Sequence, residues 1–122
     1  MSEHDEQVKV FDVLRLNEAQ YPQLAFIYAI PNGGARHPAV AGKLKAEGVK
    51  RGVSDVCVPI PSLNKHGAYF EMKFGKNKLS PEQLKFADFI KSQGYYYETV
   101  WGSDEMLTGI EFYLGIKLRG RM

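Results

Sequence analysis

Two acidic residues and a lysine on neighbouring predicted strands have types and spacing that suit metal-assisted hydrolysis. Asp55 lies near the start of one apolar run, and Glu71 and Lys73 lie in the middle of the next. Alternate residues of a strand share a face, so Glu71 and Lys73 are expected to point the same way. Two carboxylates from adjacent strands can bind one divalent cation, and the backbone carbonyl of Met72 is available as a further ligand.

Such a group suits the hydrolysis of a phosphodiester. A metal ion polarises the phosphoryl oxygen and helps to generate hydroxide near neutral pH, and a lysine can orient water or stabilise charge on a phosphate. The ordinary alternative is a cross-strand ion pair on an exposed sheet face, because an isolated E-x-K pattern is short. The context favours a site, since the basic segment KRGVSD leads into Asp55 and the segment SPEQ follows the E-x-K strand.

Helices and strands are predicted to alternate in the order α-β-α-β-β-α-β-α. Hydrophobic periodicity and breaker residues indicate helices over 3–17, 38–47, 81–93 and 104–114, and strands over 24–30, 53–60, 67–74 and 95–101. The segment SLNKHG joins the two strands that carry the acidic residues as a hairpin. The simplest way to bury these elements is an α/β fold with a central mixed sheet flanked by helices.

Serine residues mark the starts of two predicted helices. Ser80, Pro81 and Gln83 form a helix start with an N-cap serine, a proline in the first position and a glutamine at the capping-box position. Gln83 could therefore serve as the capping partner of Ser80 or support the site, and the sequence leaves both open. Ser103 is predicted to cap the last helix.

Composition limits the classes to which the protein can belong. The chain has 122 residues, enough for one domain over 1–122, and 44% of them are hydrophobic. Cys57 is the only cysteine, which excludes a disulfide framework and a cysteine-based zinc site. No apolar run is long enough to span a membrane and the start, MSEHDEQ, is acidic, so we expect a cytoplasmic protein without a membrane partner.

Basic residues are clustered although the net charge is only +2. Clusters of this kind fit an anionic partner that touches one surface, and the alternative is a set of solvated lysines. The loop Pro31-Asn32-Gly33-Gly34 is either a turn or a place where a phosphate backbone can approach closely. The best candidates for contacts with the phosphates of such a partner are Arg36, Lys43, Lys50, Arg51, Lys76 and Lys78.

Several motifs in this order resemble one family of nucleases. The segments EGVKRGVSD, AYFEMKF, KLSPEQLKFADFIKSQGY and WGSDEMLTGIEFYLG are similar to the virus-type replication–repair nuclease (VRR-NUC) family, a branch of the PD-(D/E)XK nuclease superfamily. EHDEQ near the N-terminus, IPNGG and ARHPAVAGKLKAEGVKRG resemble its stand-alone phage members. The resemblance spans nearly the whole chain and implies a restriction-endonuclease-like fold.

The resemblance also implies roles for the residues that match the motifs. Asp55 and Glu71 match the superfamily's acidic residues and would bind Mg²⁺ or Mn²⁺, with the backbone carbonyl of Met72 as a further ligand. Lys73 matches the catalytic lysine that places or activates the attacking water. Gln83 matches the glutamine of the family's S-P-x-Q helix, which would support the site.

The first predicted helix is expected to supply a further glutamate that faces the metal. Glu3, with Gln7 one turn later, fits the family's E-x-x-x-Q pattern, and Glu6 is the competitor. Either glutamate could instead complement the dipole of that helix. The chain departs from the superfamily's name at Ser54, where a proline is expected before the aspartate; a proline there shapes the backbone and contributes no ligand.

The resemblance implies a metal-dependent DNA endonuclease that cuts branched DNA, such as four-way junctions, as a homodimer. A two-fold dimer would present two sites to a symmetric junction. Three alternatives stay open: a nicking or double-strand nuclease without junction preference, a catalytically silent DNA-binding module of the same fold, and a small sheet domain with no role on nucleic acid.

Overall fold

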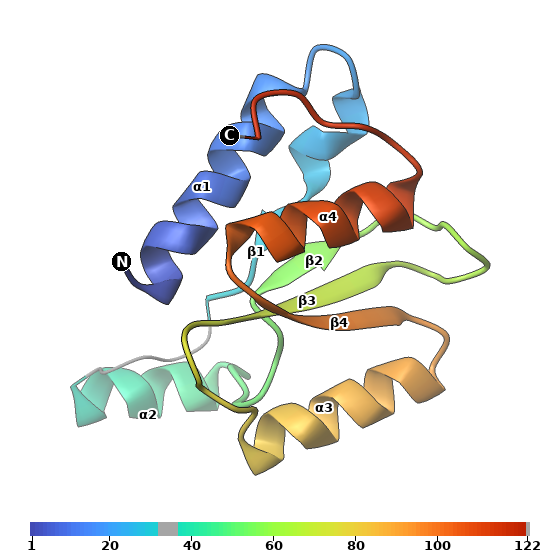
Figure 1. Ribbon diagram of the computed structural model, residues 1–122. Coiled ribbons are helices and arrows are strands. Elements are labelled where there is room, and N and C mark those ends of the chain that lie inside the picture. The colour runs from blue at the N-terminus through green and yellow to red at the C-terminus, as the bar shows by residue number, and fades with distance from the viewer. Residues whose placement is uncertain (32–36, 122) are drawn as a thin grey trace.

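A four-stranded mixed sheet forms the centre of the protein (Figure 1). Its strands lie in the spatial order β1 (Tyr28–Ala29), β2 (Val56–Val58), β3 (Ala68–Lys73) and β4 (Tyr96–Trp101). β2 pairs antiparallel with β1 and β3, whereas β3 and β4 are parallel. The computed structural model describes residues 1–31 and 37–121. The mixed sheet and its flanking helices confirm the predicted α/β fold class and the predicted order of elements.

Helices cover both sides of this sheet. They are α1 (Glu3–Leu16), α2 (Pro38–Ala46), α3 (Pro81–Ser92) and α4 (Ser103–Leu114). In Figure 1, α1 and α4 lie on one side of the sheet, and α3 and α2 lie on the other. None of the described segments contains a helix that is both long and apolar enough to cross a bilayer.

The hydrophobic core lies between the sheet and the pair α1 and α4. Strand alternation turns Ala68, Phe70 and Met72 of β3 into this core, where each is at most 1% exposed. The residues from the other elements that complete it include Val10, Leu14, Val56, Val58, Val100, Met106, Ile110 and Tyr113. Alternation along the predicted strand 67–74 would add Phe74 to this buried row, but Phe74 lies beyond the end of β3 and is 37% exposed.

The segment predicted as a strand over 24–30 is mostly a 3₁₀ helix. This helix, η1, spans Pro22–Phe26, and only the two residues of β1 pair with the sheet. Pro22 at the start fixes a backbone angle that suits a helical turn. Leu24 and Ile27 are the buried members, and their spacing of three residues matches a 3₁₀ turn rather than a strand.

The last helix begins differently from the prediction. Its N-cap is Gly102, with φ of 102°, an angle that glycine adopts at little cost. Ser103 is the first helical residue, and its backbone N–H donates to the Glu6 carboxylate at 2.9 Å. The cap therefore comes from α1, far away in the sequence, and the prediction that Ser103 caps the helix is wrong.

The predicted basic surface is only partly described. Lys43 lies in the last turn of α2, a helix in which no residue is buried. Lys50 and Arg51 follow α2, and Lys76 and Lys78 lie in the segment between β3 and α3. Arg36 and the turn residues 32–34 lie outside the described residues.

Candidate active site

The pairing of β2 with β3 places Asp55 opposite Glu71. Val56 faces Phe70 across the two antiparallel strands, and the pattern continues one residue further. The N–H of Asp55 donates to the carbonyl of Phe70 at 3.1 Å, and the N–H of Ile30 donates to the carbonyl of Asp55 at 2.7 Å. Facing residues of antiparallel strands share a side of the sheet, with Cβ atoms about 4.5–5.5 Å apart. The two acidic side chains therefore converge.

The side chain of Asp55 is held against β3. Its Oδ2 accepts a hydrogen bond of 2.7 Å from the backbone N–H of Met72. Met72 stands between Glu71 and Lys73, so this bond fixes the Asp55 carboxylate beside the E-x-K sequence. Ser54, which stands where a proline was expected, is buried, and its hydroxyl has no hydrogen-bond partner among the described residues.

The carboxyl group of Glu71 is buried and only partly satisfied. The side chain is 3% exposed, and its Oε2 accepts a hydrogen bond from Gln83 Nε2 at 3.1 Å. Its Oε1 has no hydrogen-bond partner within the described part of the chain. Burial, followed by the neighbouring Asp55 carboxyl group, raises the pKa of Glu71 to about 9. A cation held by both carboxylates would supply the missing partner and favour the ionised form.

Lys73 lies on the same face as Glu71, two residues along β3. Its positive charge acts against the raised pKa of Glu71. Lys73 nevertheless forms no salt bridge with Asp55 or Glu71 in residues 1–31 and 37–121. The ordinary interpretation of these residues, an exposed cross-strand ion pair, is therefore wrong, because Glu71 is buried and forms no salt bridge with any described residue.

Comparison with known proteins identifies the family. The VRR-NUC domain matches residues 5–104. The chain belongs to the VRR-NUC family. A solved structure described as a VRR_NUC domain protein superposes with a TM-score of 0.76 at 24% identity, covering 96% of this chain and 91% of the other. A search of curated proteins found no match. A VRR-NUC domain implies a nuclease of the PD-(D/E)XK type that acts on DNA, and such nucleases generally use divalent metals.

Gln83 combines the two roles that the sequence left open. The side-chain Oε1 of Gln83 accepts from the backbone N–H of Ser80 at 2.8 Å. The backbone N–H of Gln83 donates to Ser80 Oγ at 3.2 Å, which completes a capping box. The amide nitrogen of the same side chain is the donor to Glu71. A glutamine has an acceptor and a donor at the two ends of its amide, so the cap orients the group that donates to Glu71.

Gly52 is a positioning residue that the sequence reasoning did not single out. Its φ is +87°, and a Cβ atom at this position would lie 2.5 Å from the backbone oxygen of Glu82. The segment that leads to Asp55 therefore packs directly on the first turn of α3, next to Gln83. Glycine within KRGVSD was the available signal, although nothing local indicated its contact with α3.

Tyr97 and Thr99 on β4 lie on the same face of the sheet as Glu71. Thr99 is the parallel-strand partner of Glu71, and its Oγ1 lies 3.0 Å from the hydroxyl of Tyr97. Burial is the main cause that raises the pKa of Tyr97, with the charges of Glu71 and Asp55 adding to it. Strand alternation over 95–101 could have placed both hydroxyl groups on this face.

The two candidate glutamates of α1 have different surroundings. Glu6 is buried, and its Oε1 accepts from the N–H and Oγ of Ser103 at 2.9 and 3.1 Å, while its Oε2 pairs with Lys9 at 3.1 Å. These bonds commit Glu6 to the start of α4. Glu3 accepts from Asn77 at 3.4 Å, and its charge contributes to the raised pKa of Glu71.

Glu3 does not complete a ready-made cluster of acidic ligands. Within residues 1–31 and 37–121, no three histidine, cysteine, aspartate or glutamate side chains come close enough to hold a metal ion together. The residues that fit a cation are therefore Asp55 and Glu71, and Glu3 as a third ligand stays a prediction.

The described basic residues predicted to contact DNA lack acidic partners. They are Lys43, Lys50, Arg51, Lys76 and Lys78. None of them forms a salt bridge within the part of the chain that the structure describes, whereas Lys9 and Arg15 on α1 each pair with an acidic residue. Basic side chains without an acidic partner are available to phosphates.

Proposed function

We propose that this protein is a Mg²⁺- or Mn²⁺-dependent endodeoxyribonuclease with Asp55 and Glu71 as its metal ligands. The observation that carries the proposal is the buried, unpartnered Oε1 of Glu71 beside the Asp55 carboxylate. A buried carboxylate oxygen without a partner is costly in a structural role and useful in a site that takes a cation. The backbone carbonyl of Met72 and the carboxylate of Glu3 are the further ligands that we propose.

Each side chain has a distinct task in this proposal. A divalent cation between Asp55 and Glu71 would polarise the phosphodiester and make water a better nucleophile near neutral pH. Lys73 orients the attacking water and stabilises the negative charge that develops on the phosphate. Gln83 holds Glu71 in position through its amide. The proposed products carry 5′-phosphate and 3′-hydroxyl ends.

The proposed substrate is branched DNA, such as a four-way junction, and the proposed assembly is a homodimer. Two copies related by a two-fold axis would present two sites to a two-fold symmetric junction, and closed two-fold dimers are the commonest assembly. Lys43, Lys50, Arg51, Lys76 and Lys78 would contact the phosphates, because each is free of an acidic partner in the described residues.

A cleavage panel tests this function. Duplex, single-stranded, flap and four-way-junction DNA would be incubated with the protein in Mg²⁺, Mn²⁺ or EDTA. We expect cleavage that needs a metal and is fastest on branched DNA, and the loss of cleavage in Glu71→Gln. Glu82→Gln is the matched control, because Glu82 is exposed on α3 and the same charge is removed. Equal rates for Glu71→Gln and the unmodified protein would refute the proposed ligands.

Faster cleavage of a simple duplex than of any branched substrate would favour the alternative, a nuclease without junction preference. Sedimentation at micromolar protein tests the homodimer independently of cleavage. A strict monomer that still cuts DNA would contradict the proposed assembly while leaving the proposed ligands in place.

A further inference from the structure

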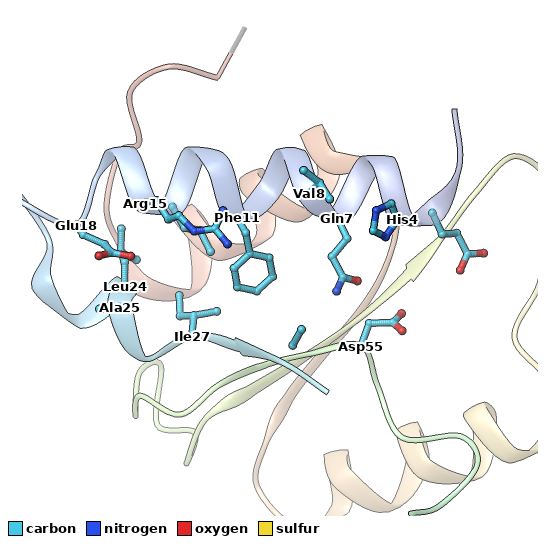
Figure 2. Close-up of a pocket in the computed structure, with 13 residues that line it drawn as sticks. His4, Gln7, Val8, Phe11, Arg15, Glu18, Leu24, Ala25, Ile27 and Asp55 are labelled. Carbon is cyan, nitrogen blue, oxygen red and sulfur yellow. The ribbon is translucent and has the colours of Figure 1, made fainter. Parts of the chain in front are cut away.

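A groove of about 660 Å³ runs along α1 and opens at Asp55 (Figure 2). α1 forms one wall, and residues of η1 and β1 form the other. Asp55 and the start of α1 mark one end, and Arg15 and Glu18 mark the opposite end. A volume of this size lies within the range of about 300–1,000 Å³ that is typical of pockets for single small ligands.

The groove lies along a face of α1 that borders its core face, and buried Leu14 belongs to both faces. Glu6 and Val10 face the core, while Val8, which lines the groove, is 44% exposed. The groove residues of α1 repeat every three or four positions, as one helix face requires: Glu3, His4, Gln7, Val8, Phe11, Leu14 and Arg15. Figure 2 shows the side chains of Gln7 and Phe11 pointing from α1 into this space.

The lining suits an uncharged aromatic ring better than a phosphate. Its middle is apolar and includes Phe11 and Ile27. Acidic residues stand near both ends, and Arg15 is already paired with Asp12 at 3.3 Å, so little positive charge is free to attract a phosphate. A nucleobase is neutral, has a flat face that stacks on aromatic side chains, and carries polar edge atoms.

The place of the groove indicates which base would occupy it. The proposed function puts the scissile phosphate beside Asp55 and Glu71, and Asp55 also lines the mouth of the groove. The nucleoside bonded to that phosphate lies within one nucleotide of the mouth. A base that is stacked and paired in a duplex must leave the stack before it can enter a protein pocket.

We infer that this groove binds one unpaired nucleobase adjacent to the phosphate that is cut, with Phe11 as its stacking surface. The inference rests on the proposed function and deepens it, since it names the substrate class. The preferred DNA has an unpaired nucleotide at the cut position, as at the base of a flap or an open branch point. Phe11 is a specificity-determining residue, because it selects the substrate without touching the reacting atoms.

The test measures binding without cleavage. The Glu71→Gln protein would be mixed, in Ca²⁺, with a flap or a duplex that carries a dye at its far end, and the ratio of the two dissociation constants gives the flap preference. In a second flap the unpaired base at the branch is 2-aminopurine, whose fluorescence reports stacking. Phe11→Leu retains an apolar side chain against the core and removes the ring.

We expect Phe11→Leu to lower the flap preference about tenfold, because base–aromatic stacking is lost. The change in 2-aminopurine fluorescence that accompanies binding should be lost in this variant for the same reason. Phe89→Leu is the matched control, since Phe89 is 60% exposed on α3, and it should change neither readout. Val8→Glu is the second groove variant. Val8 is exposed, so this variant should fold, and the added charge should lower the flap preference as well.

The inference would be overturned if the flap preference were unchanged in both groove variants. It would also be overturned if the 2-aminopurine fluorescence did not change when the protein binds. The experiments can refute the groove and the proposed nuclease function independently of each other. A protein with intact Glu71 that cuts DNA with the same substrate ranking after Phe11→Leu would refute the groove and leave the nuclease. A protein that cuts no DNA with any metal would refute the nuclease, while the binding ratio still decides whether the groove takes a base.

Discussion

Two buried glutamates of this fold have pKa values that are shifted in opposite directions. Glu6 on α1 and Glu71 on β3 are 9% and 3% exposed. Hydrogen bonding from the backbone of Ser103 is the main cause that lowers the pKa of Glu6, with burial acting the other way and Lys9 assisting. Burial is the main cause that raises the pKa of Glu71 to about 9, and Asp55 adds to it. The same residue type thus stays ionised at one position and holds its proton at the other.

The difference separates a carboxylate that serves the fold from one that serves a site. Glu6 is saturated by donors, so its charge is compensated by the protein alone. Glu71 has a buried oxygen that no described residue satisfies, and the charge of the neighbouring Asp55 opposes its ionisation. Strongly perturbed carboxyl groups next to a like charge are typical of functional sites, because an outside cation is needed to complete them.

The largest expected effect is the loss of cleavage when Glu71 is neutralised. Glu71→Gln keeps the size of the side chain and an oxygen for Gln83, yet removes a metal ligand, so we expect the single-turnover rate to fall at least about 10³-fold. The free energy of unfolding should be unchanged or higher, since a buried carboxyl group next to a like charge is gone. A variant that loses stability along with activity would place Glu71 in the same class as Glu6.

Metal affinity should rise with pH for the same reason. Glu71 must release its proton to bind a cation, so between pH 6 and 8 the affinity for Mn²⁺ should increase about tenfold per pH unit and level off near pH 9. Calorimetric titration in two buffers with different ionisation enthalpies counts the released proton. Glu71→Gln should show no such proton release.

Without metal, the stability of the folded protein should instead fall as the pH rises. A carboxyl group whose folded pKa is raised contributes its stability at low pH and loses it as pH rises toward about 9, because only the unfolded chain ionises freely. Chemical denaturation at several pH values, with and without Mn²⁺, would show the two slopes. Parallel curves would mean that the cation binds elsewhere.

The two bonds of Gln83 can be separated by substitution. Gln83→Glu keeps a residue that completes capping boxes, but places another carboxylate against Glu71, so we expect cleavage to fall about 10- to 100-fold with little change in stability. Ser80→Ala is the matched variant, because it removes the cap and leaves the amide donor; it should cost about 1 kcal/mol of stability and little activity. Equal losses of activity in both variants would show that Gln83 acts only through the helix start.

The sequence is sufficient to predict the site where local rules decide the geometry. Strand alternation places Glu71 and Lys73 on one face, and the hairpin makes β2 and β3 neighbours. The two-residue repeat of a strand and this connection are therefore enough to predict that Asp55 lies close to Glu71. The S-P-x-Q pattern predicts the cap formed by Gln83, and the family resemblance implies its support of the site. Whether one glutamine side chain can do both depends on the distance between α3 and β3, and a local sequence pattern does not predict that distance.

Contacts between distant segments account for what the sequence could not predict. The partner of Glu6 is Ser103, 97 residues away, and no local signal predicts this contact. The close packing of Gly52 on the first turn of α3 is of the same kind. The error over 24–30 has a different cause: β-branched and aromatic residues favour a strand, but Pro22 and the burial of Leu24 and Ile27 favour a 3₁₀ turn.

The smallest expected effect, on stability alone, completes the contrast. Glu6→Ala removes the acceptor at the start of α4, so the free energy of unfolding should fall by about 1–3 kcal/mol, while cleavage per folded molecule is retained. Because the pKa of Glu6 is lowered from 4.5, this contribution is complete above about pH 4.5 and disappears as pH falls through the folded value. Asp12→Ala, at an exposed ion pair on the same helix, should cost less than about 0.5 kcal/mol. Loss of cleavage without loss of stability in Glu6→Ala would instead make Glu6, rather than Glu3, the acidic residue of α1 that serves the metal.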